Sequence, residues 1–474
     1  MIYCAIFAIF KTEHTMNFVE ELRWRGMLHD IMPGTEDVLS KGMVSGYIGF
    51  DPTADSLHVG SLAQIMTMIH FQRAGHKPFA LVGGATGMVG DPSGKSAERN
   101  LLSEDVLQQN LAAIKNQLER FLDFNCGANS AEMVNNYDWF KDFTFLSFIR
   151  DVGKHITVNY MMAKDSVKNR ISGDTGMSFT EFTYQLVQGY DFYYLWKNHD
   201  CALQMGGSDQ WGNIVTGTEL IRRKDGGEAY ALTTQLIKKA DGSKFGKTEG
   251  GNIWLDPGKT SPSQFYRFWR NSSDIDAKAF IKIFTLQNKA TIDALFEEHD
   301  ATPHLWKLQK TLAKEVTEMV HGKEALNRVL LEVNFTTDSN YTWQDILPLS
   351  EKDLLKMFVS NEGSIKTSVF FAGRGFAPVF TNDIVSFLSE LTSYNEQLVP
   401  EKLFESKGEI KRLILNGGIS INKIKIHLES KLDDFVKHTD KYLFIQKGKN
   451  KSVLVDFCED VGVEIDKIKS FIKD

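Results

Sequence analysis

The sequence predicts an α/β fold built on a doubly wound parallel sheet, followed by an α-helical domain and a small α+β module. From about residue 45 to 250, short apolar runs alternate with helical patterns, as strands and crossover helices do in a parallel sheet. From about residue 260 to 333 the pattern is helical. In the last stretch the local charge turns positive, with six basic and two acidic residues between Ser406 and Lys431.

The expected strands can be placed individually. Gly46–Phe50 is predicted to be a strand, Leu62–Phe71 a helix, Pro78–Val82 the next strand and Leu203–Met205 a later one. Ligands of such Rossmann-like sheets bind outside the carboxyl ends of the strands. The glycines after Ile48, Val82 and Met205 should therefore cluster where a nucleotide would lie.

The second half of the chain has helical patterns and then a separate tail. Helices are expected over Ser263–Asn271, Ala277–Phe284, Thr291–His299 and Leu305–Val320, with Gly322 at a helix end. The expected divisions are an extension over residues 1–15, a catalytic domain over 16–256, a helical domain over 257–333, a connecting segment over 334–395 and an RNA-binding module over 396–474.

Composition excludes several classes of protein. A chain of 474 residues is too long for one ordinary domain, and a formal net charge of −7 argues against a protein that coats nucleic acid over its whole surface. The four cysteines form no CxxC pair, which predicts a reducing, cytoplasmic location and no structural metal site. The longest apolar run, Ile2–Phe10, is too short to span a membrane. Met16 begins an amphipathic segment, so residues 1–15 are expected to derive from an upstream start codon, which mass spectrometry of the N-terminus would test.

Two short motifs predict an ATP site that is closed from both sides. His58-Val59-Gly60-Ser61 opens a predicted helix, where free N–H groups and an imidazole donor suit a phosphate. Lys244-Phe245-Gly246-Lys247-Thr248 brings paired lysines on a loop, which suits accumulating phosphate charge. The alternatives are a helix-capping histidine and an ordinary surface loop.

The glycine-rich run from Gly83 to Ser96 is not a Walker loop. That motif needs four residues between its first glycine and the Gly-Lys pair, whereas Gly90 and Gly94 have three between them. The run nevertheless suits a backbone close to a ligand, with Asp91 able to face an ammonium group. The alternative is a turn-rich connection in which Asp91 is a local cap.

Two further groups of polar residues are candidate binding residues. Tyr184, Gln188 and Asp191 share one face of an otherwise apolar helix and need polar partners. Asp209-Gln210 follow the glycines of a predicted strand end, where an aspartate can accept from ribose hydroxyls. A partly solvated helix and a helix cap are the respective alternatives.

The tail contains a basic helix followed by a turn. Lys407, Lys411 and Arg412 fit one helical face, and Asn416-Gly417-Gly418 then leads into a short alternating strand. This arrangement is a candidate grip on RNA phosphates. A solvated charged helix is the alternative.

At these residues the chain resembles bacterial-type tyrosyl-tRNA synthetases, a class I aminoacyl-tRNA synthetase family, from about Met16 to Lys425. The resemblance is carried by several ordered segments: Tyr47 to Gly60, Gly84 to Lys95, Asn136 to Trp139, Phe179 to Phe192, Gly206 to Ile214 and Asp241 to Thr248. It implies that tyrosine is activated with ATP, releasing pyrophosphate, and is then transferred to the terminal adenosine of tRNA(Tyr).

The resemblance also implies roles for individual residues. The substrate hydroxyl would be bound by Tyr47 and Asp191, its ammonium group by Asp91, Tyr184 and Gln188, and its carboxylate would lie near Gln210. ATP would be bound by Asp51, Gly60, Asp209 and Lys247. The departing pyrophosphate would be stabilised by Thr53, His58, Lys95, Arg99, Lys244, Lys247 and Thr248. Serine at position 61, where histidine or asparagine is usual, predicts altered nucleotide affinity.

The resemblance extends to the other domains and to partners. It implies an anticodon-binding role for the helices after Pro257, an RNA-binding module over Ser406–Lys425, Mg²⁺ accompanying ATP, and a homodimer bridged by tRNA. Two rivals are a tryptophanyl-tRNA synthetase, disfavoured by Tyr47 with Asp191, and a non-catalytic RNA-binding paralogue. Adenylate formation would distinguish the paralogue from an enzyme.

Overall fold

A computed structural model describes the chain over residues 17–91, 103–171, 176–243, 245–248, 251–337, 341–351, 354–355, 367–374, 377–378, 383–394, 400–435, 437, 441–448 and 451–457. The chain divides into two compact units, each treated by itself below. One comprises Met1–Thr260 and Phe265–Val320, and the other comprises Ser261–Gln264 and His321–Asp474.

The first unit is built on a six-stranded sheet whose order is β1-β6-β5-β2-β3-β4. All neighbouring strands run parallel except β1, which pairs antiparallel with β6 at one edge. The strands are β1 (Leu28–Ile31), β2 (Ser45–Phe50), β3 (Lys77–Val82), β4 (Glu132–Asn135), β5 (Cys201–Gly207) and β6 (Tyr230–Thr234). This sheet confirms the predicted doubly wound fold, and β2, β3 and β5 fall where the apolar runs predicted strands.

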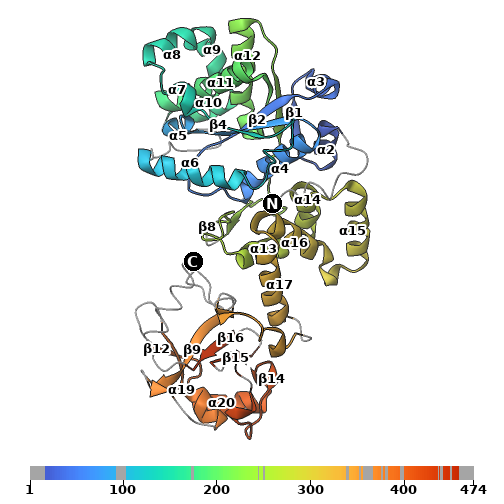
Figure 1. Cartoon of the computed structure of the whole chain (residues 1–474), viewed down its shortest axis with the longest axis vertical. Coiled ribbons are helices and arrows are strands. Elements are labelled where there is room, and N and C mark those ends of the chain that lie inside the picture. Colours follow the sequence, from blue (N-terminus) through green and yellow to red (C-terminus); the bar gives the residue numbers. More distant parts are fainter. Residues whose placement is uncertain are drawn as a thin grey trace. The chain divides into compact units, whose positions relative to one another are not determined.

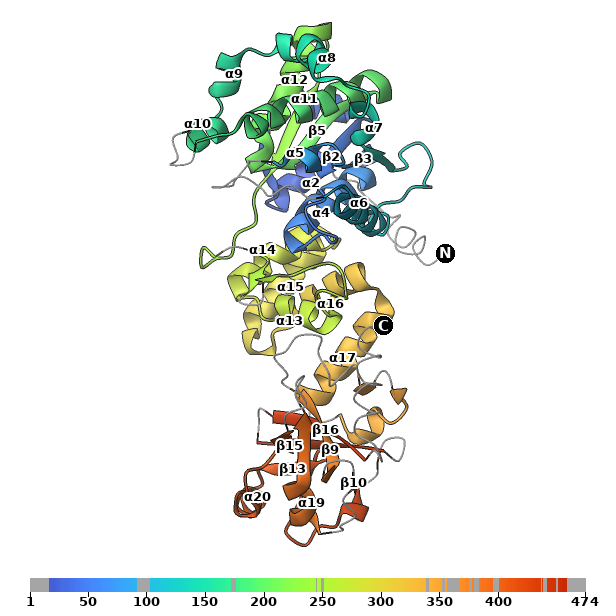
Figure 2. The same ribbon diagram turned by 90° about the vertical axis from the view of Figure 1, so that its left-hand side faces the viewer.

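Helices cover both faces of this sheet (Figures 1 and 2). On one face lie α2 (Phe18–Trp24), α4 (Val59–Arg73) and α6 (Glu104–Leu118). On the other lie α7 (Tyr137–Phe140), α8 (Phe145–Asp151), α9 (Val158–Met162), α10 (Asp165–Ile171), α11 (Phe179–His199) and α12 (Trp211–Asp225). The shorter helices α3 (Thr35–Lys41) and α5 (Thr86–Val89) complete this part.

The core of the unit is continuous from the sheet into α4. This helix is buried on nearly all sides and therefore has no solvent-facing polar stripe. At its far end, Phe71 packs so close to β2 that a Cβ on Gly46 would lie 2.9 Å from the ring. Residue 46 must therefore be glycine for α4 to lie flat on the sheet. The start of α4 is thereby held at the carboxyl end of β2.

The hairpin of β7 (Lys247–Thr248) and β8 (Gly251–Asn252) leads from the sheet to a block of helices. The block contains α13 (Pro262–Arg270), α14 (Asp274–Phe284), α15 (Lys289–Ala301) and α16 (Lys307–His321). One boundary differs from the sequence prediction. A 3₁₀ turn over Pro303–Leu305 ends at Trp306, whose φ of 54° is left-handed, so the last helix begins at Lys307. Gly322, with φ of 85°, follows its end as predicted.

The second unit consists of α17 (Lys323–Thr337), α19 (Ile384–Glu390) and α20 (Lys407–Leu415) around a mixed sheet of order β12-β11-β9-β16-β15-β13-β14. Its strands are β9 (Thr367–Arg374), β10 (Ala377–Pro378, paired with β9), β11 (Leu391–Tyr394), β12 (Pro400–Lys402), β13 (Ile419–Ile421), β14 (Ile424–Lys425), β15 (Tyr442–Lys447) and β16 (Lys451–Asp456). β9 runs parallel to β16. Strands from the expected connecting segment thus pair with strands of the expected C-terminal module.

Candidate active site

Tyr47 and Asp191 form the innermost part of the candidate site. Tyr47 lies in the middle of β2, and Asp191 points inward from α11, with 1% of each residue exposed. Burial, together with the nearby Asp191 carboxyl, raises the pKa of Tyr47 well above its usual value, so the phenol stays protonated. Its hydroxyl oxygen is buried and has no hydrogen-bond partner among the described residues. A polar ligand atom at this place would remove the cost of that unmade bond.

Asn136 and Trp139 hold Asp191 in place. The amide of Asn136 donates to Oδ2 at 3.1 Å and the indole N–H of Trp139 donates to Oδ1 at 2.9 Å. Burial raises the pKa of Asp191 to about 8, with a smaller contribution from Asp51, although both hydrogen bonds act in the opposite direction. The segment from Asn136 to Trp139 carries part of the family resemblance, but the sequence predicts no role for either residue. A polar residue and a tryptophan directly after β4 were the available signal.

Tyr184 and Asp51 form a hydrogen-bonded pair in the candidate site. The Tyr184 hydroxyl donates to Oδ2 of Asp51 at 3.0 Å, and the Thr86 hydroxyl donates to Oδ1 at 2.8 Å. The pKa of Tyr184 is raised well above its usual value by burial and by Asp51 and Asp91. Because the Tyr184 hydroxyl donates its hydrogen bond to Asp51, its oxygen can accept a hydrogen bond from an ammonium group. A Cβ on Gly83 would lie 2.4 Å from the Asp51 carboxylate, which explains the glycine there.

Asp91, Gln210 and Asp209 form a polar chain at the carboxyl ends of the strands. Gln210 Nε2 donates to Oδ2 of Asp91 at 2.9 Å and lies 3.2 Å from Oδ2 of Asp209. Asn213 Nδ2 in turn donates to Oε1 of Gln210 at 3.3 Å. The side-chain oxygen of Gln188 is buried and, within the described parts of the chain, has no partner. These residues present two carboxylates and amide groups to one place.

His58 is both a helix cap and a possible donor, so the two interpretations of the sequence are compatible. It is the N-cap of α4, and its Nδ1 accepts from the Gly60 N–H at 3.0 Å. Because Nδ1 accepts, the proton of the neutral ring is on Nε2, which can donate to a ligand. A Cβ on Gly60 would lie 2.7 Å from the imidazole, so glycine is required for this ring position.

The lysine loop is described only in part. Lys247 is exposed on β7, and Thr53 is exposed in the segment after β2, where its N–H donates to the carbonyl of Asp51. The predicted residues Lys95, Arg99 and Lys244 lie outside the described residues, as does the side chain of Thr248. The loop approaches the start of α4 closely, since a Cβ on Gly246 would lie 2.7 Å from Val59.

The predicted RNA-binding residues lie on α20 in the second unit. Lys407, Lys411 and Arg412 are all exposed, and Lys407 donates to the Ser386 hydroxyl at 2.9 Å. The helix is capped by Ser406, whose side chain accepts from the Glu409 N–H. Ile410 and Ile414 are buried on its other face, so the three cations point away from the core.

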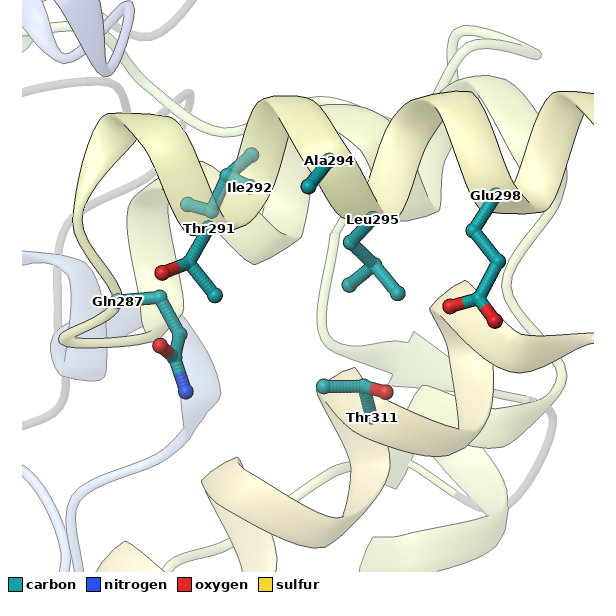
Figure 3. A pocket seen from close by; sticks show the side chains of 7 residues that line it. All are labelled: Gln287, Thr291, Ile292, Ala294, Leu295, Glu298 and Thr311. Atoms are coloured by element: carbon teal, nitrogen blue, oxygen red, sulfur yellow. The ribbon is translucent and has the colours of Figure 1, made fainter.

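A shallow cavity of about 240 Å³ lies in the helical block, between α15 and α16 (Figure 3). It is lined by Gln287, Thr291, Leu295, Glu298 and Thr311 among others, and the described lining contains no cationic side chain. The cavity therefore offers nothing that would attract a phosphate, and we assign it no chemistry.

None of the helices in the described parts of the chain combines the length and apolar character needed to cross a membrane. Over those same residues, histidine, cysteine and carboxylate side chains form no group that could hold a metal ion. The candidate site is a cluster of hydroxyls, carboxylates and amides at the carboxyl end of a parallel sheet.

Comparisons of the sequence with known proteins find a consistent group of relatives. The family profile described as "tRNA synthetases class I (W and Y)" matches residues 40–336. A curated tyrosine–tRNA ligase from Bacteroides fragilis is 55% identical over 448 residues, covering 93% of this chain and 99% of that protein. The tyrosine–tRNA ligase of Porphyromonas gingivalis is also 55% identical over 445 residues, with the same coverage.

Solved structures show the same similarity. The chain is similar to a C-terminally truncated mitochondrial tyrosyl-tRNA synthetase of Aspergillus nidulans, with a TM-score of 0.62 and 30% identity over 68% of this chain and 94% of that one. The corresponding Coccidioides posadasii structure has a TM-score of 0.58 and 28% identity, covering 66% of this chain and 91% of that one.

Proposed function

Because this chain belongs to the class I tRNA synthetases of the tryptophan and tyrosine group and has the activity of a tyrosine–tRNA ligase, we propose that Tyr47 and Asp191 select the substrate by its phenol hydroxyl. The substrates are tyrosine, ATP and tRNA. The observation that carries the proposal is the buried Tyr47 hydroxyl, which lacks a partner among the described residues and lies beside the Asp191 carboxyl. The substrate hydroxyl would accept from Tyr47 and donate to Asp191.

The remaining polar residues would orient the reacting end of tyrosine. The ammonium group would donate to Asp91, the Tyr184 oxygen and the Gln188 amide oxygen, which would leave the carboxylate near Gln210. Asp209 would accept a hydrogen bond from the ATP ribose, and Asp51 and Gly60 would also contact ATP. The tyrosine carboxylate then attacks the α-phosphorus of ATP, a P–O bond to pyrophosphate breaks, and tyrosyl adenylate forms. No side-chain acid or base is required, because positioning lowers the barrier.

Negative charge develops on the leaving pyrophosphate, and hydrogen-bond donors and cations around the ATP phosphates would stabilise it. His58 Nε2 at the start of α4 and Thr53 in the segment after β2 would supply neutral donors, and Lys247 would supply a cation from the loop. Lys95, Arg99, Lys244 and Thr248 are proposed to add to these. Mg²⁺ would enter as part of the ATP substrate, bound by its phosphate oxygens.

In the second step a ribose hydroxyl of the terminal tRNA adenosine attacks the carbonyl carbon of the adenylate, and AMP leaves. The helical block would bind the anticodon region, and Lys407, Lys411 and Arg412 would bind RNA phosphates. The three cations face outward on one helix, and such contacts provide affinity without sequence specificity.

We also propose that the protein acts as a homodimer. Large apolar side chains are exposed on α8, α9 and the start of α11: Phe145 (64%), Leu146 (76%), Val158 (61%) and Phe179 (66%). Exposed apolar surface on soluble domains marks contact surfaces where it is contiguous, and we propose that these side chains form one such surface. A second copy of the chain is the occupant that the family resemblance implies.

Tyrosine-dependent exchange of pyrophosphate into ATP tests the proposal. Exchange should occur with tyrosine, should not occur with phenylalanine or tryptophan, and should be lost in Asp191→Ala. Exchange that persists in Asp191→Ala would contradict the assigned pocket, and exchange with tryptophan in place of tyrosine would contradict the selection by hydroxyl.

A further inference from the structure

Phe245, between the lysine positions of the loop, faces the helical block. Its ring centroid lies 4.9 Å from that of Phe280 and 5.4 Å from that of Phe284, with the latter pair stacked at 16°. Phe268 and Trp269 of α13 lie 5.7 and 5.8 Å away. Trp269, Phe280 and Phe284 are almost fully buried, so Phe245 inserts into the core of α13 and α14.

A hydrogen bond attaches the start of the loop to the same block. The Ala240 N–H donates to Oδ1 of Asp276 at 2.7 Å, in the first turn of α14. The other carboxylate oxygen of Asp276 accepts from the Ser273 hydroxyl at 2.8 Å, which fixes the carboxylate. Ala240 is therefore held by α14, and Phe245 by α13 and α14.

The residues after Phe245 lie against the start of α4. Gly246 has φ of 77° and leaves no room for a Cβ beside Val59. Its carbonyl accepts from the Ile253 N–H, and the Ile253 carbonyl accepts from the Val59 N–H, both at 2.9 Å. One continuous hydrogen-bonded path thus joins the residue after Phe245 to the residue after His58.

We propose that Phe245 is a positioning residue: the aromatic cluster of Phe268, Trp269, Phe280 and Phe284 holds its ring and thereby fixes Lys247 relative to the start of α4. Phe245 does not itself contact the substrate. The inference rests on the proposed function, in which Lys247 and His58 stabilise the leaving pyrophosphate. It links the helices proposed to bind tRNA with the loop proposed to bind phosphate.

The expected defect is specific to the chemical step. Misplacement of a charged group by about 1 Å can lower a rate about 100-fold, so Phe245→Ala and Phe245→Leu should lower kcat of pyrophosphate exchange by about 10- to 100-fold. The tyrosine pocket lies on β2 and α11, so the dissociation constant for tyrosine without ATP should stay within about twofold of wild type. A generally loosened fold would change both quantities.

Phe265→Leu is the matched control. Phe265 is a fully buried aromatic of α13 that packs on Trp269, with ring centroids 6.0 Å apart. It should reduce stability without lowering kcat. Phe284→Leu should lower kcat as the Phe245 variants do, and Phe245→Leu combined with Phe284→Leu should be no worse than the stronger single variant, because both break one contact.

The outcomes separate the inference from the proposed function. A wild-type protein without tyrosine-dependent exchange would overturn the proposed function and the inference with it. An active wild type whose Phe245 variants keep their kcat would overturn the inference alone. So would an equal loss of kcat in Phe265→Leu, or additive losses in the double variant.

Discussion

The Trp139 indole N–H donates to Oδ1 of Asp191 at 2.9 Å while the Trp139 ring stacks on Tyr194 at 4.5 Å. Stacking fixes the indole, and the indole fixes the carboxylate that is proposed to read the substrate hydroxyl. The acceptor is thus oriented before tyrosine arrives, so little ordering cost remains for binding.

Trp139→Phe should weaken tyrosine binding by about 1.5–3 kcal/mol, because it keeps an aromatic ring but removes a hydrogen bond to a carboxylate that is ionised when tyrosine is bound. Equilibrium dialysis with labelled tyrosine measures the change. The matched control is Trp196→Phe, whose indole donates to the Glu228 carbonyl at the surface. If Trp139→Phe bound tyrosine as tightly as Trp196→Phe does, Trp139 would not orient Asp191.

The affinity for tyrosine should depend on pH through Asp191. Burial raises the pKa of this carboxyl to about 8 in the free protein, whereas a phenol that donates to it favours the ionised form. Binding then releases a proton, so affinity should rise with pH, by up to about tenfold per pH unit, and level off above about pH 8. Dialysis at several pH values measures this. Asp191→Asn should bind tyrosine weakly, with an affinity that does not change with pH. If the affinity of this variant rose with pH as steeply as that of wild type, the titrating group would not be Asp191.

His58 should have separable structural and chemical roles. His58→Asn keeps a good N-cap for α4 but shortens the donor, so its free energy of unfolding should stay near wild type while kcat of exchange falls. His58→Ala should in addition lose about 1 kcal/mol of stability. Urea unfolding together with exchange kinetics distinguishes the two roles. A normal kcat in His58→Asn would leave His58 as a cap only.

Phe179→Asp should dissociate the proposed homodimer, because it places a charge in the exposed apolar surface of α8, α9 and α11. Sedimentation velocity reports the mass in solution. Ile424→Asp is the control, since Ile424 is 60% exposed on β14 in the second unit. A wild-type protein that sediments as a monomer would refute the dimer, whatever the variants do.

Lys411→Ala combined with Arg412→Ala should weaken tRNA binding. It should also reduce the slope of log K against log salt concentration by the amount expected for the loss of about two phosphate contacts. Tyrosine-dependent exchange should be unchanged, because no tRNA takes part in it. Filter binding at several salt concentrations measures the slope, with Lys115→Ala on α6 as an exposed-lysine control. An unchanged slope would mean that α20 does not contact RNA.

Local patterns predicted the first unit well. The apolar runs of β2, β3 and β5 have glycines at or near their carboxyl ends, and each strand is found within two residues of its expected ends. Helix α4 begins at Val59 directly after its cap His58, as the motif predicted, whereas the apolar run alone indicated only Leu62–Phe71. Trp306 was expected inside a helix, but its left-handed backbone delays the helix start to Lys307.

Contacts that depend on distant pairing could not be read from the sequence. β9 lies beside β16, some 80 residues later, and neither strand carries a signal for its partner. Asn136 and Trp139 meet Asp191 only because β4 and α11 are brought together by the sheet. The ring of Phe245 was read as part of a lysine motif, whereas its position depends on two helices that follow it in the chain.

The most direct test of the account compares tyrosine with phenylalanine as ligands of the wild type and of Tyr47→Phe, by equilibrium dialysis. If Tyr47 reads the substrate hydroxyl, the variant should lose about 1 kcal/mol of affinity for tyrosine and none for phenylalanine. Equal losses for both ligands would contradict the account, because they would mean that Tyr47 only shapes the pocket.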